Sequence, residues 1–100
     1  MCLFELGLLV ITDAAQETLN HLGIKPLALI TRHRKGDWGD VPHETNRANQ
    51  HALRRGGGLH SSYLLGTQIV RVMTHPQRSR TMICLPSEVA LYTSLFSQEH

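Results

Sequence analysis

The sequence predicts a single α+β domain, because its apolar periodicity changes once along the chain. Residues 1–58 have a mainly helical pattern, residues 59–86 alternate as short strands, and residues 87–100 form a C-terminal helix or tail. An apolar arm or strand, residues 3–12, comes first. A length of 100 residues suits one domain with one core. We therefore expect a three-stranded antiparallel meander with helices packed on one face.

Capping residues predict three short helices. The first, about residues 14–22, follows a Thr12 cap, and the second runs from Pro26 to about residue 35. The third runs to about residue 55, with Asp40 as its cap. It is strongly polar, which predicts that most of its surface faces solvent.

The rest of the chain has the pattern of an antiparallel sheet. Strands are predicted at Leu59–Leu65, Gln68–Thr74 and Arg80–Leu85, which are short and rich in β-branched or aromatic residues. Gly66-Thr67 joins the first two as a hairpin. A short terminal helix is expected from about Ser87.

Composition excludes several classes of protein. No apolar run approaches the ~20 residues of a membrane span, and Cys2 and Cys84 form neither a CxxC pair nor a disulfide framework. We expect a cytoplasmic protein that is not bound to a membrane, with no metal and no cofactor. The histidines show no metalloprotease or zinc-finger spacing.

Positive charge is concentrated in the middle of the chain. Residues 32–80 contain nine Arg and Lys against three Asp and Glu, and they include all eight arginines. Arginine suits forked contacts with phosphate or carboxylate, so this segment indicates an anionic partner. A solvated surface that maintains solubility would have the same composition.

The densest polar cluster is residues 32–43, which contain two carboxylates, two histidines and three cations around the only tryptophan. One interpretation makes it a site for acid–base chemistry or ligand binding. The other gives each residue a structural role as a helix end, a cap or a local ion pair. Along the third helix, Arg47, His51 and Arg54 fall close to one face, as a phosphate-binding stripe would. The candidate binding residues are Arg32, Arg34, Asp37, Trp38, Arg47 and Arg54.

A second set of polar residues comes from the strands. Ser61 and Tyr63 share a face by the alternation rule, and Thr74 is expected on a shared face of the next strand. If that sheet face is exposed and lies near His33 and Arg78, it holds what a metal-independent ribonuclease needs: a base or acid, a phosphate clamp and positioning groups. Hydroxyl residues and arginine are also ordinary on solvated strands.

The segment Arg32-His33-x-x-Gly36-Asp37-Trp38-Gly39-Asp40 resembles a family of short bacterial proteins described as plasmid-related and carried on mobile elements. The resemblance covers roughly residues 4–86 and includes Asn49, Ala52-Leu53, Gly56-Gly57, Ser61, Tyr63, Thr74, Arg78-Ser79, Thr81 and Leu85-Pro86. It implies a bacterial origin and no settled activity. His75-Pro76-Gln77 stands where acidic residues are expected in such relatives, and the hairpin turn is shorter.

Two functions remain open from the sequence, and it does not decide whether the protein is an enzyme. The first is a small soluble mobile-element accessory protein that binds nucleic acid or an acidic protein, as a monomer or a homodimer. Its anion-facing patch would consist of Arg32, Arg34, Arg47, Arg54 and Arg78. The second is a metal-independent endoribonuclease, with His33, Ser61, Tyr63, Thr74 and Arg78 as its site.

Overall fold

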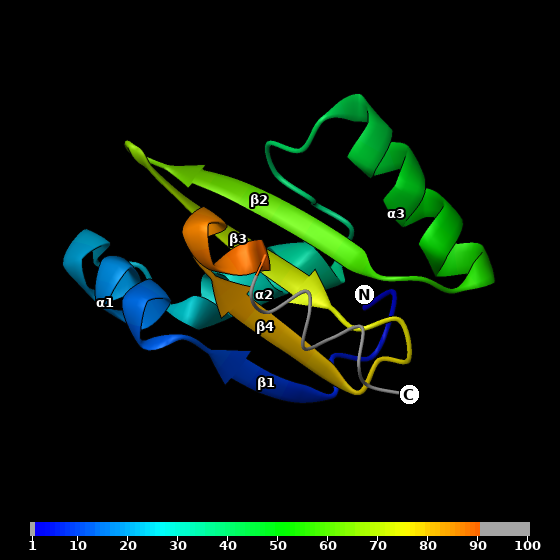
Figure 1. Ribbon diagram of the computed structural model, residues 1–100, viewed down its shortest axis with the longest axis horizontal. Helices are drawn as coiled ribbons and strands as arrows, with labels where there is room; N and C mark the ends of the chain where they lie inside the picture. Colours follow the sequence, from blue (N-terminus) through cyan, green and yellow to red (C-terminus); the bar gives the residue numbers. More distant parts are fainter. Residues whose placement is uncertain (1, 91–100) are drawn as a thin grey trace.

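The computed structural model describes residues 2–90. The helices are α1 (Asp13–Leu22), α2 (Pro26–Arg34) and α3 (His43–Arg55), followed near the end by a 3₁₀ turn, η1 (Pro86–Glu88). The strands are β1 (Leu8–Ile11), β2 (Leu59–Leu65), β3 (Gln68–Thr74) and β4 (Arg80–Cys84). Together they make the expected α+β fold (Figure 1).

The first two helices begin and end where their capping residues predict. The Thr12 hydroxyl accepts a hydrogen bond from the Ala15 N–H at 3.1 Å, which satisfies one of the free amides at the start of α1. Gly23 ends α1 with a φ of 70°, a left-handed conformation that glycine adopts without strain. Pro26 occupies the first turn of α2, where its missing N–H costs no hydrogen bond.

The start of α3 differs from the prediction. The residue at its N-cap is Pro42, and no side chain caps the helix. Asp40 instead accepts a hydrogen bond from the Leu64 N–H of β2 at 2.9 Å. An aspartate can accept a hydrogen bond either from the first turn of its own helix or from a strand that is distant in sequence. Here the Asp40 carboxylate bonds to the strand.

The sheet has four strands and is mixed, so the prediction of a three-stranded antiparallel sheet is corrected. The strand order is β1-β4-β3-β2, in which β2, β3 and β4 form the expected antiparallel meander. The N-terminal strand β1 adds to β4 in parallel, with Leu8 opposite Arg80 and Ile11 opposite Ile83. Alternation within a strand predicts its faces but not its partner, and this addition was therefore missed.

The helices do not all cover one face. Apolar side chains of α1 and α2, among them Leu19 and Ile30, pack against β2, β3 and β4 to form the main core. On the opposite face Met73, Met82 and Cys84 pack with Val89, just after η1. The third helix stands beside the β2 edge, as Figure 1 shows. Only α1 and α2 therefore match the expected one-sided packing.

The predicted C-terminal helix falls mostly on residues 91–100, outside the described residues. Its beginning is seen as η1, after which Val89 and Ala90 continue in helical conformation. Within residues 2–90, no helix has the length and apolarity to cross a bilayer.

The outer edge of β2 is closed by hydrogen bonds from other parts of the chain. The buried Asn49 of α3 accepts the His60 N–H at 3.0 Å and donates to the His60 carbonyl at 2.8 Å, as a neighbouring strand would. The Ser62 N–H donates to the Trp38 carbonyl, and the Ser62 carbonyl accepts from Asp40. These bonds attach α3 and its preceding loop to the sheet.

Replacing Asn49 tests this attachment. We expect Asn49→Ala to lower the free energy of unfolding by about 2 kcal/mol, because two backbone groups of His60 lose their partners. Gln50→Ala, at an exposed position of the same helix, should change it by less than about 0.5 kcal/mol. Urea titration of both variants measures the difference, and equal effects would contradict the role given to Asn49.

Candidate functional site

Four polar side chains form a buried chain of hydrogen bonds between α2 and the sheet. His33 Nδ1 lies 2.6 Å from Ser61 Oγ, and His33 Nε2 lies 2.9 Å from Thr74 Oγ1. Thr74 Oγ1 lies 2.8 Å from Thr81 Oγ1, and the Thr81 hydroxyl donates to the Leu6 carbonyl at 2.8 Å. The chain therefore joins β2, α2, β3, β4 and the segment before β1.

With His33 neutral, one arrangement of protons satisfies every bond. The Leu6 carbonyl can only accept, so Thr81 donates to it and must accept from Thr74. Thr74 then accepts from His33 Nε2–H, and His33 Nδ1 accepts the Ser61 hydroxyl proton. The imidazole has no free lone pair in this arrangement.

Burial keeps that imidazole neutral. Desolvation, with smaller contributions from His60 and Arg78, lowers the pKa of His33 to about 3. His33 of α2 and the two strand residues that it contacts, Ser61 and Thr74, are each at most 1% exposed. The ribonuclease hypothesis requires this sheet face to be exposed, and that condition is not met, because this face carries the main core. The geometry favours a structural role for a cluster that was considered catalytic.

Tyr63 and Arg78, the other two residues of the ribonuclease hypothesis, also have partners within the protein. The fully buried Tyr63 donates its hydroxyl to the Asp37 carbonyl at 2.7 Å, and burial raises its pKa to about 12. The Arg78 guanidinium donates to the Gly57 carbonyl at 2.7 Å and to the Ala52 carbonyl at 3.2 Å. Arg78 has a φ of 60°, and these two hydrogen bonds place its guanidinium at the end of α3. It holds α3 to the turn between β3 and β4.

The tryptophan loop, residues 35–42 between α2 and α3, is packed against the sheet. Gly39 has a φ of 73° and pairs with Ser62, and a Cβ there would overlap the Ser62 carbonyl oxygen. Trp38 is 4% exposed and contacts the rings of Phe4 and His33. Within residues 2–90 its indole N–H has no hydrogen-bond partner. The indole ring is thus buried, whereas Asp37, Gly39 and Asp40 of the same loop are exposed.

Arg32 and Asp37 form an ion pair at the start of this loop. Arg32 Nε lies 2.7 Å from Asp37 Oδ2, and the guanidinium stands 4.4 Å from the centre of the Tyr63 ring. The paired guanidinium lowers the pKa of the Asp37 carboxyl, and Asp37 raises that of Arg32. Arg34 is half-buried, and its Nε has no partner among residues 2–90. These three charges are held close to the loop.

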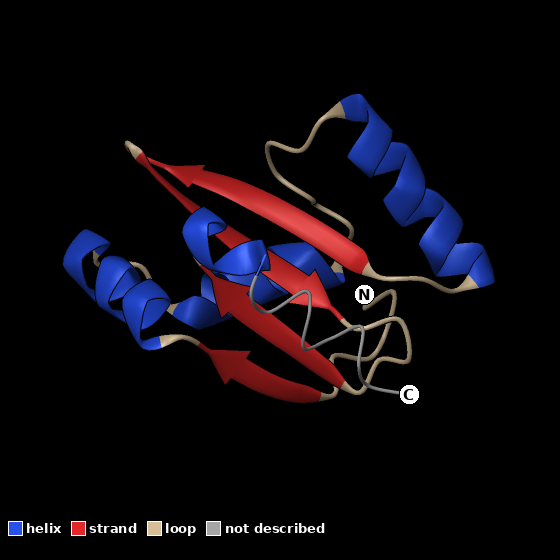
Figure 2. Ribbon diagram, in the orientation of Figure 1, coloured by secondary structure: helices blue, strands red, loops and turns tan. Residues whose placement is uncertain are grey.

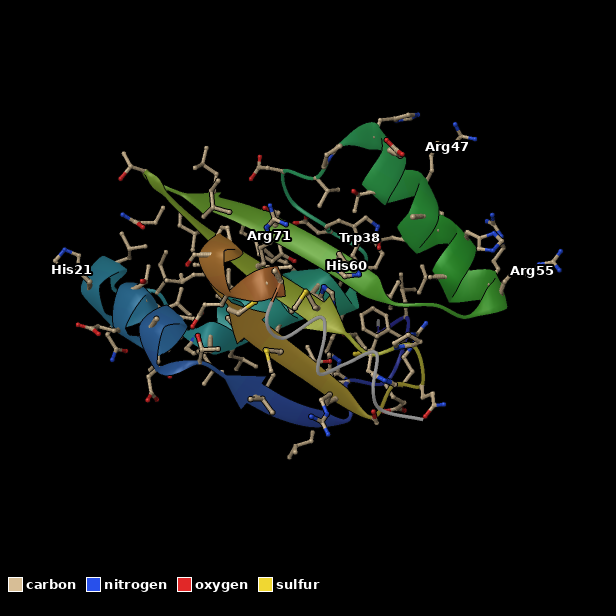
Figure 3. All side chains as sticks on the ribbon, in the orientation of Figure 1. His21, Trp38, Arg47, Arg55, His60 and Arg71 are labelled. Carbon is tan, nitrogen blue, oxygen red and sulfur yellow. The ribbon has the colours of Figure 1, made fainter. Side chains whose placement is uncertain are left out.

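The outer face of α3 carries the two remaining predicted arginines, Arg47 and Arg54, and α3 also carries Arg55. All three are exposed, and within the described part of the chain none of them pairs with an acid. Figure 3 shows Arg47 and Arg55 extending from α3 away from the sheet. His43 and His51 complete a shallow groove along this face. Glu44, the one acid of the helix, lines it too.

The structure brings the predicted residues together in two separate groups. Arg32, Arg34, Asp37 and Trp38 surround the loop, and Arg47 and Arg54 lie on α3, whereas Arg78 serves the interior. A shallow hollow between the loop and α3 connects the two groups, since His43 and Asn46 line both this hollow and the groove. His43 was missed as a member of the basic face, although its spacing of four from Arg47 places it there.

Comparison with known protein families, curated proteins and solved structures found no match. Within residues 2–90, no three His, Cys, Asp or Glu side chains gather as a metal site requires.

The buried His33 makes stability depend on pH. Its pKa is near 6.5 when unfolded and about 3 when folded, so its contribution is complete above pH 6.5 and declines as pH falls. We expect a loss of about 2 kcal/mol in the free energy of unfolding between pH 6.5 and 5. Urea titrations across this range should show a smaller loss for His33→Gln, which cannot titrate. An equal loss in both proteins would refute this origin.

Proposed function

We propose that the protein is a small soluble binding module, an accessory of bacterial mobile DNA, that contacts nucleic acid through the outer face of α3. The assignment to bacterial mobile DNA comes from the family resemblance, and the expectation of a soluble, cytoplasmic protein comes from the composition. The binding part comes from the structure of α3.

The observation that carries the proposal is the contrast among the arginines. Arg32 and Arg78 are engaged by a carboxylate and by backbone carbonyls, so their charge serves the fold. Arg47, Arg54 and Arg55 project from one helix, and no acid among residues 2–90 pairs with them. These three exposed guanidinium groups contribute nothing to the packing of the core, and phosphate is the partner they suit best.

The way in which α3 is attached to the sheet fits this role. Asn49 and the apolar Ala52 face the sheet, while Arg78 fixes the last turn from below. A helix of 13 residues is about 20 Å long and can lie across a duplex groove. The arginines thus stand on a rigid element, so binding them costs little additional ordering.

Salt-dependent binding tests the proposal. We expect the logarithm of the affinity for duplex DNA to fall with the logarithm of salt concentration with a slope of about −3, one unit for each of the three arginines. The double variant Arg47→Ala, Arg54→Ala should reduce the magnitude of that slope by about two. Fluorescence anisotropy with a labelled duplex measures both slopes.

The control removes the same charge elsewhere. Lys25→Ala with Arg71→Ala takes two cations from the start of α2 and from β3, where Figure 3 shows Arg71 on the sheet. It should preserve most of the slope. Equal losses in the two double variants would indicate a general charge effect and refute an α3 interface. Binding to polyglutamate but not to DNA would identify an acidic protein as the partner instead.

The ribonuclease hypothesis is tested in the same samples. A metal-independent ribonuclease would cleave the RNA form of the probe in EDTA, and the cleavage would be lost on His33→Ala. Because His33 is buried with both ring nitrogens bonded, we expect intact RNA. Cleavage that survives gel filtration with the protein and disappears in the variant would overturn this expectation.

A further inference from the structure

The groove along the outer face of α3 holds a neutral amide between two cations. Arg47 and Arg54 both line it and are seven residues apart, so they project from nearly the same side of the helix, two turns from each other. That spacing is about 10 Å along the helix axis. Gln50 and His51 occupy the turn between them, and both are exposed.

The position of α3 leaves this face accessible. Figure 2 shows α3 at the periphery of the molecule, beyond β2, and Figure 3 shows Arg47 extending away from the sheet. Glu44, the one acid of α3, precedes Arg47 by three residues, so it lies outside the stretch between the two arginines. The side chains of that stretch carry no negative charge.

The spacing of the two arginines matches the major groove of duplex DNA. That groove is about 12 Å wide, and an α-helix with its side chains is about 10–12 Å across, so α3 fits into it. Arg47 and Arg54 can then each reach a phosphate on one of the two backbones that border the groove. The minor groove is about 6 Å wide and does not admit a helix.

Other nucleic acids fit α3 less well. The major groove of A-form RNA is deep and narrow, and side chains do not reach its base edges. A single strand has one backbone rather than two, and the proteins that bind it stack its bases on aromatic rings. The sequence of α3, His43–Arg55, contains no Trp, Tyr or Phe. The spacing and the composition of the helix therefore both favour duplex DNA.

We propose that α3 enters the major groove of duplex DNA and that Gln50 contacts the base edges there. This docking rests on the proposed function, and it specifies the partner as B-form DNA. With Arg47 and Arg54 on the two backbones, Gln50 faces the floor of the groove between them. Its amide suits adenine, because its NH₂ donates to N7 while its oxygen accepts from the N6 amino group. Gln50 is thus a specificity-determining residue.

Three labelled probes of matched sequence test the class of partner by fluorescence anisotropy. We expect a DNA duplex of about 20 base pairs to bind roughly tenfold more tightly than the matching RNA duplex or single DNA strand. Equal affinity for either of the other probes overturns the docking, and the proposed function survives if Arg47→Ala with Arg54→Ala still weakens binding. Absence of binding to all three probes overturns both.

Removing one acceptor atom from the groove tests the role of Gln50. An alternating adenine–thymine duplex offers adenine in every register, and 7-deazaadenine lacks N7 but keeps the charge and the base pairing. We expect this replacement to weaken wild-type binding roughly tenfold. Gln50→Ala should bind the unmodified duplex roughly tenfold more weakly than the wild type, and the two duplexes equally. Its salt dependence should match that of the wild type, because glutamine carries no charge.

Gln68→Ala is the matched control. Gln68 is exposed at the start of β3, at the hairpin end of the sheet and away from α3. This variant should keep both the wild-type affinity and the sensitivity to 7-deazaadenine, and circular dichroism confirms that both variants fold. Equal binding of the two duplexes by the wild type, or equal losses in the two variants, refutes base contact by Gln50. A salt slope that still depends on Arg47 and Arg54 in that case leaves the proposed function standing.

Discussion

A buried chain of hydrogen bonds from Ser61 through His33, Thr74 and Thr81 to the Leu6 carbonyl determines how the two halves of the protein meet. The Leu6 carbonyl at its end can only accept, and this fixes the direction in which every other group of the chain donates its proton. The chain works only with a neutral imidazole, and the same burial that disfavours protonation provides that state. His33 therefore has a structural role, although hydroxyl groups also surround the histidines of acid–base catalysts.

Fixing His33 fixes the end of α2 and, with it, the tryptophan loop. Trp38 packs against His33, and Gly39 pairs with β2, so the loop leads the chain along the sheet edge to α3. Asn49 and Arg78 then hold α3 by its side and by its end. The inner face of α3 thus packs against the sheet, and its charged face is exposed to solvent. The proposed binding face is a consequence of this attachment.

Local signals predicted much of the fold. The bounds of β2 and β3, the hairpin and the cap at Thr12 all follow from neighbours in sequence. Predictions were wrong where a distant partner decides: Asp40 bonds to β2 rather than to its own helix, and β1 joins β4. The site followed the same rule. Alternation placed Ser61 and its neighbours on one face, but which face is covered depends on where α2 packs.

The fold protects one edge of the sheet with hydrogen bonds from side chains and loops. The β2 edge is closed by the Asn49 side chain of α3 and, from the loop, by the Trp38 carbonyl and by the N–H and carboxylate of Asp40, so the polar middle segment of the sequence protects that side. Nothing of the kind follows β1, because α1 turns away directly after Thr12 to cover the sheet face. Within residues 2–90, the same helix that completes the main core therefore leaves the outer side of β1 without the side-chain hydrogen bonds that protect β2.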